Sequence, residues 1–334
     1  MRPLPDALTA DPAASRPGPA GSALPTFTVV VCAYTSARWP AIEAAIQSVL
    51  DQSHPPVEVL LVIDHDDLLL ERARRAFTRV RVVPNDGPAG LSGGRNTGVR
   101  HARGEVVAFL DDDARADRRW LERLARWYDD PRVVGAGGVV IPEFVDGEPA
   151  WLPRELHWIV GGTHTGVPTA VAPVRNSFGS NMSFRREALD EVGGFAPALG
   201  RGGVAQMCCE ETELSIRVGR ARRACTVLHV PGAVVHHAVP SERATWDYLF
   251  RRSWIEGRSK ALVARSVGMG PGLQSERAYV SRVLPRGVAR GLRDALRGDS
   301  AGLGRAAAIV ASLATTVAGY AYGTVAATRR RRRG

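Results

Sequence analysis

The feature that most constrains this chain is a run of three aspartates, Asp111, Asp112 and Asp113, directly after the apolar segment 106–110. A short apolar run of this kind indicates a buried strand. Three adjacent carboxylates cannot lie inside a hydrophobic core, because burying uncompensated charge is too unfavourable. They therefore mark the C-terminal end of the strand, which is where open α/β sheets bind ligands. Crowded carboxylates repel one another unless a cation neutralises them, and such oxygen ligands suit Mg²⁺ or Mn²⁺. Taken alone, the stretch can also be a solvated acidic turn.

Strand-like and helix-like segments alternate along the first part of the chain. Apolar, β-branched runs predict strands, and amphipathic stretches predict helices. This alternation predicts an α/β fold with a parallel sheet and right-handed crossovers. The strand ends at Asp64 and Asp111 then fall on one edge of the sheet. We expect strands at 27–33, 57–63, 80–83 and 106–110, and helices at 39–52, at 68–77 and in a short stretch that ends at 102–104.

A glycine-rich stretch at 85–98 precedes the short helix, and we expect it to be a loop. It is not the dinucleotide fingerprint, because nothing after the first strand reads G-x-G-x-x-G, and the chain has no Walker lysine. Gly93 and Gly94 permit close backbone approach, and the next residue, Arg95, supplies a cation whose planar fork suits a phosphate or a base edge. A plain surface arginine is the alternative for Arg95 taken alone.

In their order and spacing, these features resemble the family 2 glycosyltransferases of the GT-A fold. The resemblance covers roughly residues 28–260 and implies a Rossmann-like, mostly parallel central sheet flanked by helices. It rests on the end of the first strand at Tyr34, the strand end at Asp64, the stretch 90–98 with Arg95, and the aspartates at 111–113.

The resemblance also implies roles for the residues that match the family's motifs. Asp64 would bind the base of a nucleotide, Asp111 would lie near the ribose, and Asp113 would be the metal ligand of a D-x-D pair. Asp112 stays open between ligand and spacer, and Arg95 would lie beside the nucleotide. The residues implied to bind the nucleotide sugar are Ala33, Tyr34, Asp64, Arg95, Asn96, Asp111, Asp112 and Asn181.

The second half of the chain is predicted to supply the acceptor side. We expect a helix at 118–128, a strand at 133–141, an aromatic and glycine-rich stretch at 151–165, and a helix that begins within 180–186. By the resemblance, Asn181 in the last of these would lie near the donor sugar.

Acidic side chains cluster on the first turn of a helix predicted within 209–217. Carboxylates are stabilised at a helix N-terminus, which alone can explain them. The family's usual pattern is Glu-Asp-x-Glu/Asp-Leu, and here Glu211 stands in place of the aspartate. The resemblance therefore implies that the catalytic base is Glu211 or Glu210, with Glu211 preferred.

A histidine pair, His236 and His237, follows a predicted strand at 224–230 and a predicted turn at Pro231 and Gly232. By the resemblance, His237 would complete metal or diphosphate binding together with Asp113, and the cofactor would be Mn²⁺ or Mg²⁺. An exposed pair on a strand is the alternative interpretation.

The formal charge of +10 is concentrated at the C-terminal end. Residues 241–334 carry 18 basic and 6 acidic side chains, a balance of +12, whereas residues 1–240 carry 26 and 28, a balance of −2. Lys260 is the only lysine, so the arginine excess looks more like compositional bias than a binding surface. The four cysteines, Cys32, Cys208, Cys209 and Cys225, show no zinc-ligand or redox spacing, and we interpret them as reduced cytosolic thiols.

The C-terminal region predicts contact with a membrane. Between Arg305 and Arg329 lie 23 uncharged residues, which as a helix would measure about 34 Å and could cross a bilayer. The basic segment before it can lie on anionic headgroups. We therefore expect a cytoplasmic protein associated with the inner face of the cell membrane; a soluble helix packed on the catalytic domain is the alternative.

These features predict five segments along the chain. They are a disordered leader at 1–26, a nucleotide-binding half at 27–115, an acceptor half at 116–240, a helical basic extension at 241–304, and an apolar helix with an arginine tail at 305–334. The two halves together form a GT-A catalytic domain at 27–240.

The predicted function is that of an inverting, metal-assisted glycosyltransferase. Its partners would be a nucleotide-diphosphate sugar and a glycan, lipid-linked or small-molecule acceptor, and the resemblance implies a role in cell-envelope or polysaccharide synthesis. A sugar-nucleotide pyrophosphorylase would need a basic, glycine-rich phosphate loop directly after the first strand, where this chain has Cys32, Ala33 and Tyr34. The remaining alternative is a non-catalytic protein that binds a nucleotide, another anion or nucleic acid through the arginine-rich tail; strongly salt-dependent binding of nucleic acid would support it.

Overall fold

The chain divides into two compact units. The structure, a computed structural model, describes residues 24–200, 207–268, 270 and 274–331. Unit 1 comprises Met1–Ile141, Pro168–Gly203 and Glu210–His237, and unit 2 comprises Pro142–Val167, Val204–Cys209 and Ala238–Gly334. Except for residues 24–26, the predicted disordered leader lies outside the described residues.

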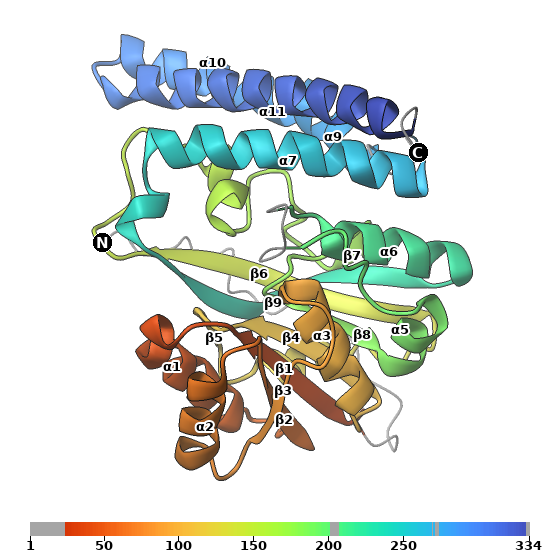
Figure 1. Cartoon of the computed structure of the whole chain (residues 1–334). Helices are drawn as coiled ribbons and strands as arrows, with labels where there is room; N and C mark the ends of the chain where they lie inside the picture. The colour runs from red at the N-terminus through yellow and green to blue at the C-terminus, as the bar shows by residue number, and fades with distance from the viewer. Residues whose placement is uncertain (1–23, 201–206, 269, 271–273, 332–334) are drawn as a thin grey trace. The chain divides into compact units, whose positions relative to one another are not determined.

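Unit 1 contains the sheet and the helices that cover it (Figure 1). The strands are β1 (Phe27–Ala33), β2 (Glu58–Ile63), β3 (Arg81–Pro84), β4 (Val106–Asp111), β5 (Ala114–Ala116), β6 (Val133–Phe144), β7 (Ala172–Val174), β8 (Met182–Arg185) and β9 (Thr226–Val239), of which β6 and β9 continue into unit 2. The helices are η3 (Ser36–Arg38), α1 (Trp39–Leu50), α2 (Asp67–Ala76), α3 (Leu91–His101), α4 (Trp120–Ala125), α5 (Arg186–Val192) and α6 (Glu210–Ala221).

The sheet is mixed, with strand order β3-β2-β1-β4-β8-β6-β9-β5, and β7 pairs with β9. The first four strands of this order pair in parallel, as their alternation with helices predicts. The pairs β4–β8, β6–β8, β5–β9 and β7–β9 are antiparallel. Because Cys32 lies opposite both Val62 and Asp111, the ends of β1, β2 and β4 meet at one edge, which confirms the predicted α/β arrangement of these strands.

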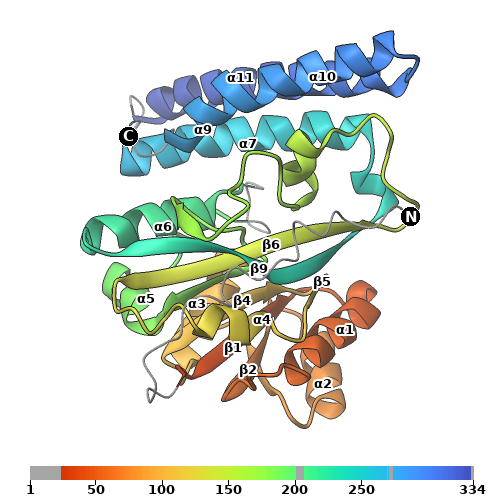
Figure 2. The same cartoon turned by 180° about the vertical axis from the view of Figure 1, so that it is seen from behind.

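Because successive side chains of the central strands point to opposite faces of the sheet, they pack against helices on both faces. On β1, Val29 and Val31 face a core that includes residues of α1, α2 and α4, whereas Val30 faces a core built with α3, α5 and α6. The predicted strand 27–33 has its observed bounds because every residue except the half-buried Cys32 is buried. In Figures 1 and 2, α1 and α3 flank β1 from the two sides.

The glycine-rich stretch is largely helical, which corrects the prediction of a loop through residue 98. Helix α3 begins at Leu91, after Gly90 with φ of 110°. A Cβ on Gly98 would lie 2.4 Å from Val30 Cγ1, and one on Gly93 would lie 1.8 Å from the Pro88 carbonyl oxygen. The glycines therefore allow the helix to pack closely against the sheet and against the loop before it. Glycine content alone does not distinguish such close packing from a flexible loop.

Helix α5 begins at Arg186, at the end of the range 180–186 in which a helix start is predicted; before it the chain forms β8, which is not predicted, because Met182 and Phe184 are buried in the core. One further prediction about local structure is wrong. Pro231 and Gly232 make no turn, since β9 runs through them from Thr226 to Val239. The extended path lets one strand pair with β7 near its start and with β5 near its end.

Unit 2 is mainly helical, in agreement with the predicted helical extension and apolar helix. Its core contains Leu156 and Ile159 of the 3-10 helix η4, together with Leu249, Leu284 and Ile309. The boundaries of the predicted domains stay predictions; residues 142–167, which lie far earlier in the chain, also belong to this unit. Its elements are η4 (Arg154–Val160), η5 (Ser241–Arg243), α7 (Trp246–Val267), α9 (Gln274–Ala278), the π-helical turn η6 (Tyr279–Val283), α10 (Leu284–Leu296) and α11 (Ala301–Arg331).

Candidate active site

The three aspartates lie where β4 leaves the sheet. Asp111 is the last residue of β4, and β5 begins at Ala114. The pairing of Ala114 with His237 in β9 brings the histidine next to the aspartates, although the two segments are far apart in sequence. His237 Nε2 lies 3.1 Å from Asp113 Oδ1.

Asp111, Asp113 and His237 form a cluster that fits a divalent cation. One ligand atom from each residue lies within 4.8 Å of the others. Two carboxylate oxygens and one imidazole nitrogen are donors that Mn²⁺ and, with more oxygen ligands from a substrate, Mg²⁺ accept. The residues present therefore fit the metal that the sequence predicts, and both predicted ligands, Asp113 and His237, belong to the cluster together with Asp111.

Asp112 is not part of this cluster and is paired with Arg38. Arg38 Nη1 donates to Asp112 Oδ1 across 3.1 Å and lies 3.2 Å from Asp113 Oδ2. Burial, reinforced by the charge of Asp113, raises the pKa of Asp112 from 3.8 to about 7, and Arg38 opposes this rise. Arg38, the last residue of η3 and the N-cap of α1, is not among the predicted site residues, because no local sequence pattern marks it.

Arg95 is buried and connects the aspartates to helix α6. Its Nη1 donates to Glu210 Oε1 across 2.8 Å, and its Nη2 donates to Asp111 Oδ1 across 3.2 Å and to the Gly179 carbonyl across 3.0 Å. Burial alone would lower the pKa of the Arg95 guanidinium, but Glu210 and Asp111 raise it on balance, so the side chain stays cationic. The alternative of a surface arginine is therefore wrong.

The two candidate bases have different surroundings on the first turn of α6. The Glu210 side chain is buried against Arg95, and the pair forms an ion pair. Glu211 is half-buried, and its Oε1 accepts a hydrogen bond from Thr212 Oγ1 across 3.2 Å. Glu210 is therefore bound to an internal partner, whereas Glu211 is a partly exposed residue.

Asp64 holds the loop that leads to α3. Its Oδ1 accepts from Asn85 Nδ2 across 2.6 Å, and its Oδ2 accepts from the Gly90 N–H across 2.8 Å. Ala33 at the end of β1 is buried, whereas Tyr34 is 54% exposed. This edge of the sheet therefore combines an exposed aromatic ring with a carboxylate that fixes a loop.

Asn96 and Asn181 use their amides inside the protein. Asn96 donates to the Phe195 carbonyl across 2.8 Å and accepts from the Phe195 N–H across 2.7 Å. Asn181 has no exposed surface; it accepts from Trp120 Nε1 and donates to the carbonyls of Val139 and Ala233. Both side chains join separate segments of unit 1, and a direct contact of Asn181 with a sugar would require it to leave these partners.

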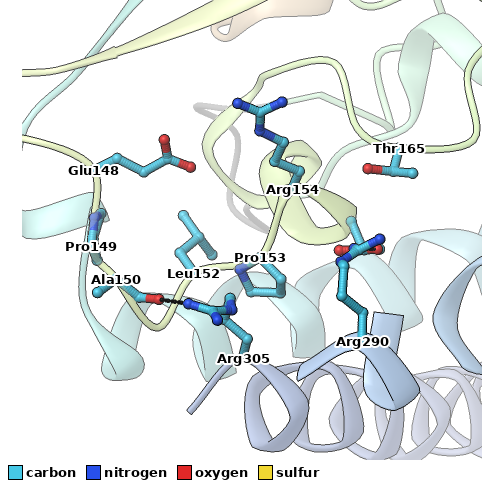
Figure 3. Close-up of a pocket in the computed structure, with 10 residues that line it drawn as sticks. Glu148, Pro149, Ala150, Leu152, Pro153, Arg154, Thr165, Arg290 and Arg305 are labelled. Carbon is cyan, nitrogen blue, oxygen red and sulfur yellow. Dashed lines mark hydrogen bonds and ion pairs between the residues drawn. The ribbon is translucent and has the colours of Figure 1, made fainter. Parts of the chain in front are cut away.

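Unit 2 contains a separate polar cavity of about 570 Å³ (Figure 3). Two of its arginines are already paired: Arg290 with Glu155, and Arg305 with Asp294, Asp299 and the Ala150 carbonyl. Its lining includes none of the predicted site residues, so we assign it no part in the candidate active site. The lining consists of Glu148, Pro149, Ala150, Leu152, Pro153, Arg154, Glu155, Thr165, Arg290 and Arg305.

Comparison with protein families and curated proteins identifies relatives of this chain. The model of the family described as "Glycosyl transferase family 2" matches residues 28–193. The glucosyl-dolichyl phosphate glucuronosyltransferase of Haloferax volcanii is 34% identical over 240 residues, which cover 71% of this chain and 76% of that protein. The succinoglycan biosynthesis protein ExoM of Rhizobium meliloti is 27% identical over 241 residues, which cover 69% and 72%.

Comparison with solved structures shows the fold. The mannosyltransferase PcManGT from Pyrobaculum calidifontis, solved with GDP-Man and Mn²⁺, aligns over 91% of both chains with a TM-score of 0.57 and 20% identity. GalNAc-T7, solved with UDP, GalNAc and Mn²⁺, aligns with a TM-score of 0.51 and 18% identity over 73% of this chain and about half, 51%, of that chain. Both are glycosyltransferases of the GT-A fold, so the predicted fold class is confirmed.

Proposed function

The chain belongs to glycosyl transferase family 2 and is a glycosyltransferase, and from this we propose that it is an inverting, metal-assisted transferase. Its donor is a nucleotide-diphosphate sugar, and its acceptor is a hydroxyl group. The observation that carries the proposal is the cluster of Asp111, Asp113 and His237, which Arg95 connects to the acidic first turn of α6. The cluster and the acidic turn provide the two kinds of group that the reaction needs.

Asp113, His237 and Asp111 would hold Mn²⁺ or Mg²⁺. When bound, the cation supplies positive charge that stabilises the departing diphosphate. Arg38, 3.2 Å from Asp113, adds a fixed cation beside the cluster. Arg95 restrains Asp111 from the other side through the hydrogen bond to its Oδ1.

Glu211 is the proposed catalytic base. The acceptor oxygen attacks the anomeric carbon, the bond between that carbon and the diphosphate oxygen breaks, and Glu211 takes the hydroxyl proton. Glu210 is a positioning residue in this proposal, because its carboxylate is bound to the Arg95 guanidinium. Attack in a single step from the face opposite the leaving group inverts the configuration.

The nucleotide is proposed to lie at the edge formed by the ends of β1, β2 and β4. Asp64 would bind the base, and its contacts with Asn85 and Gly90 support a fixed carboxylate at that position. The exposed ring of Tyr34 offers a flat surface beside it. Asn96 and Asn181 would act by holding the surrounding segments in place.

The acceptor is proposed to be a glycan or a lipid-linked sugar at the cytoplasmic face of a membrane. Two observations support this class: the relative from Haloferax volcanii is named as a glucosyl-dolichyl phosphate glucuronosyltransferase, and the relative from Rhizobium meliloti is named for succinoglycan biosynthesis. Helix α11 is, by length and composition, apolar enough to interact with a bilayer over Ala301–Ala326.

Release of nucleoside diphosphate tests the proposal directly. A panel of UDP-, GDP- and dTDP-sugars is offered with Mn²⁺, with Mg²⁺ and with EDTA, to the wild type, to Asp113→Ala and to the control Asp190→Ala, which removes an exposed acid outside the cluster. We expect metal-dependent turnover of one donor that only Asp113→Ala abolishes. If turnover is slow with every donor, binding of each donor is measured by calorimetry. Absence of both binding and turnover with every donor and metal would exclude the proposal.

A further inference from the structure

Helix α11 carries an exposed face without a charged side chain. Between residues 303 and 325, seven exposed positions recur at intervals of four and three, which places them on one side of the helix; Ala318, Tyr322 and Thr324 are also exposed. Four of the seven are large and more than half exposed: Leu303 (58%), Val310 (56%), Val317 (59%) and Val325 (53%). Along the axis this face extends about 33 Å. We call it the α11 stripe; it comprises Leu303, Ala307, Val310, Ala314, Val317, Ala321 and Val325.

The opposite face of α11 is already packed against α7. Ser312 Oγ and Ser253 Oγ lie 2.9 Å apart and share a hydrogen bond. A Cβ on Gly257 would lie 2.0 Å from the Thr316 carbonyl oxygen, and one on Gly319 would lie 2.5 Å from the Trp254 carbonyl oxygen. The two backbones are therefore in contact over several turns. The residues of the stripe stay exposed after this packing, and within the described residues of unit 2 no side chain buries them.

The same packing argues against α11 as a helix that crosses the bilayer. Its partner α7 carries Arg252, Glu256 and Lys260 on the segment beside it, and these side chains are ion-paired with each other. If α11 crossed a membrane in this packing, α7 would carry these charges into the hydrocarbon, where charged side chains are strongly disfavoured. The structure favours a helix that lies along the bilayer surface with α7 on its far side.

Helix α10 extends the apolar surface and adds positive charge. It packs on α11 closely enough that a Cβ on Gly291 would lie 2.7 Å from the Gly302 carbonyl oxygen. Leu292 and Leu296 are exposed, Leu296 at 89%. Along η6 and α10 and at the residue that caps α10 lies a row of exposed arginines, and none of them forms an ion pair with a side chain in the described part of the chain. These arginines are Arg282, Arg286, Arg293 and Arg297.

We propose that α10 and α11 form a surface that docks this protein onto an anionic phospholipid bilayer, with both helices in the membrane plane. The α11 stripe, Leu292 and Leu296 enter the boundary between headgroups and acyl chains, and the arginine row binds headgroup phosphates. The pairing of an uncharged apolar face with unpaired arginines selects this partner over a second copy of the chain, whose identical arginines would repel. The inference rests on unit 2 alone and does not depend on the proposed transferase chemistry.

Vesicle flotation of the full chain tests the surface. We expect binding to vesicles of phosphatidylcholine with phosphatidylglycerol, weaker binding to phosphatidylcholine alone, and loss of binding in high salt. The double variant Val310→Glu/Val317→Glu should weaken binding at least about tenfold, and Arg286→Gln/Arg293→Gln should weaken it about tenfold on anionic vesicles only. Val57→Glu is the matched control, because Val57 is a valine of unit 1 with the same exposure, 56%. A chain that stays unbound with every vesicle composition overturns the proposal.

A second measurement separates docking in the plane from crossing. Membrane vesicles from expressing cells, right-side-out and inverted, are treated with external protease, and tags at the two ends of the chain are followed. Helices in the membrane plane leave both tags on the cytoplasmic face, so both are digested in inverted vesicles only. Digestion of the two tags from opposite faces would mean that α11 spans the bilayer and would refute the proposal. A soluble dimer that Val310→Glu/Val317→Glu dissociates, without vesicle binding, would also refute it.

Discussion

Arg95 and Glu210 form a buried ion pair, in which Arg95 Nη1 donates to Glu210 Oε1 across 2.8 Å. The pair joins the N-terminal half of α3 to the first residue of α6. Through its other nitrogen, Arg95 also binds Asp111 at the end of β4. One guanidinium therefore fixes the relative position of the proposed metal cluster and the acidic turn that carries the proposed base.

Removal of either partner of this pair should destabilise unit 1. Arg95→Met leaves a buried carboxylate and Glu210→Gln leaves an underbalanced buried cation, so we expect each to cost about 3 kcal/mol. The double variant should cost less than the sum, because neither charge is then left alone. Urea unfolding measures all three. The control is Arg75→Met/Glu71→Gln, an exposed pair 2.7 Å apart, which should change stability by less than about 1 kcal/mol. Additive effects at positions 95 and 210 would contradict the coupling.

Glu211→Gln should separate catalysis from stability. If Glu211 is the base, kcat should fall by about 10²–10⁴ while donor binding and unfolding stay close to those of the wild type. If Glu210 is the base instead, Glu211→Gln should retain most of the activity, and the assignment of roles on α6 must be reversed. Glu43→Gln, an exposed acid on α1, serves as the matched control. The measurement is steady-state nucleotide release together with calorimetric donor binding.

Mn²⁺ should stabilise the wild type through Asp111, Asp113 and His237. A ligand that binds only the folded state at 100 times its Kd adds about 2.7 kcal/mol to the free energy of unfolding, so the melting temperature should rise with added Mn²⁺. Asp113→Asn and His237→Ala should reduce this rise, and Asp190→Asn should not. An equal rise in Asp113→Asn and the wild type would place the ion elsewhere in the protein. This measurement needs no donor and no acceptor.

His229 should make the protein less stable in acid. Its ring is buried in β9, and its Nε2 has no hydrogen-bond partner in the described part of the chain. Burial lowers the pKa of His229 from 6.5 to about 4. The unfolded chain therefore takes up a proton that the folded chain excludes, and stability falls as the pH drops from about 6.5 toward 4, by about 2 kcal/mol between pH 7 and pH 5.

Urea unfolding at pH 7 and pH 5 measures this loss. His229→Leu should lose less stability between the two values than the wild type does. The control is His65→Asn, because the His65 ring is half exposed and asparagine tolerates its φ of 53°. An unchanged pH dependence in His229→Leu would show that other groups cause the acid sensitivity.

The sequence predicts those parts of the site whose structure is determined by a single continuous segment of the chain. The strand 27–33 and the emergence of Asp111 at a strand end follow from apolar runs and from the cost of burying charge, and both are local. Arg38 is different: no local pattern marks it, and its role arises only when β4 places Asp112 and Asp113 beside it. The extended path through Pro231 likewise follows from pairing with two other strands, which no local rule contains.

Replacing a glycine by alanine should have opposite effects on stability at Gly98 and at Gly219. In α3, a Cβ on Gly98 would lie 2.4 Å from Val30 Cγ1 and 2.8 Å from Val30 Cγ2, so Gly98→Ala must displace the buried Val30 side chain, its strand or the helix. Overpacking of this kind costs about 1–3 kcal/mol. In α6, a Cβ on Gly219 meets nothing within 4 Å, so Gly219→Ala should stabilise the chain by up to about 1 kcal/mol through helix propensity. Urea unfolding of the two variants should therefore give shifts of opposite sign. If Gly98→Ala is as stable as the wild type, α3 does not pack on β1 as closely as described, and Arg95, three residues earlier on the same helix, loses the support that aims it at Asp111 and Glu210.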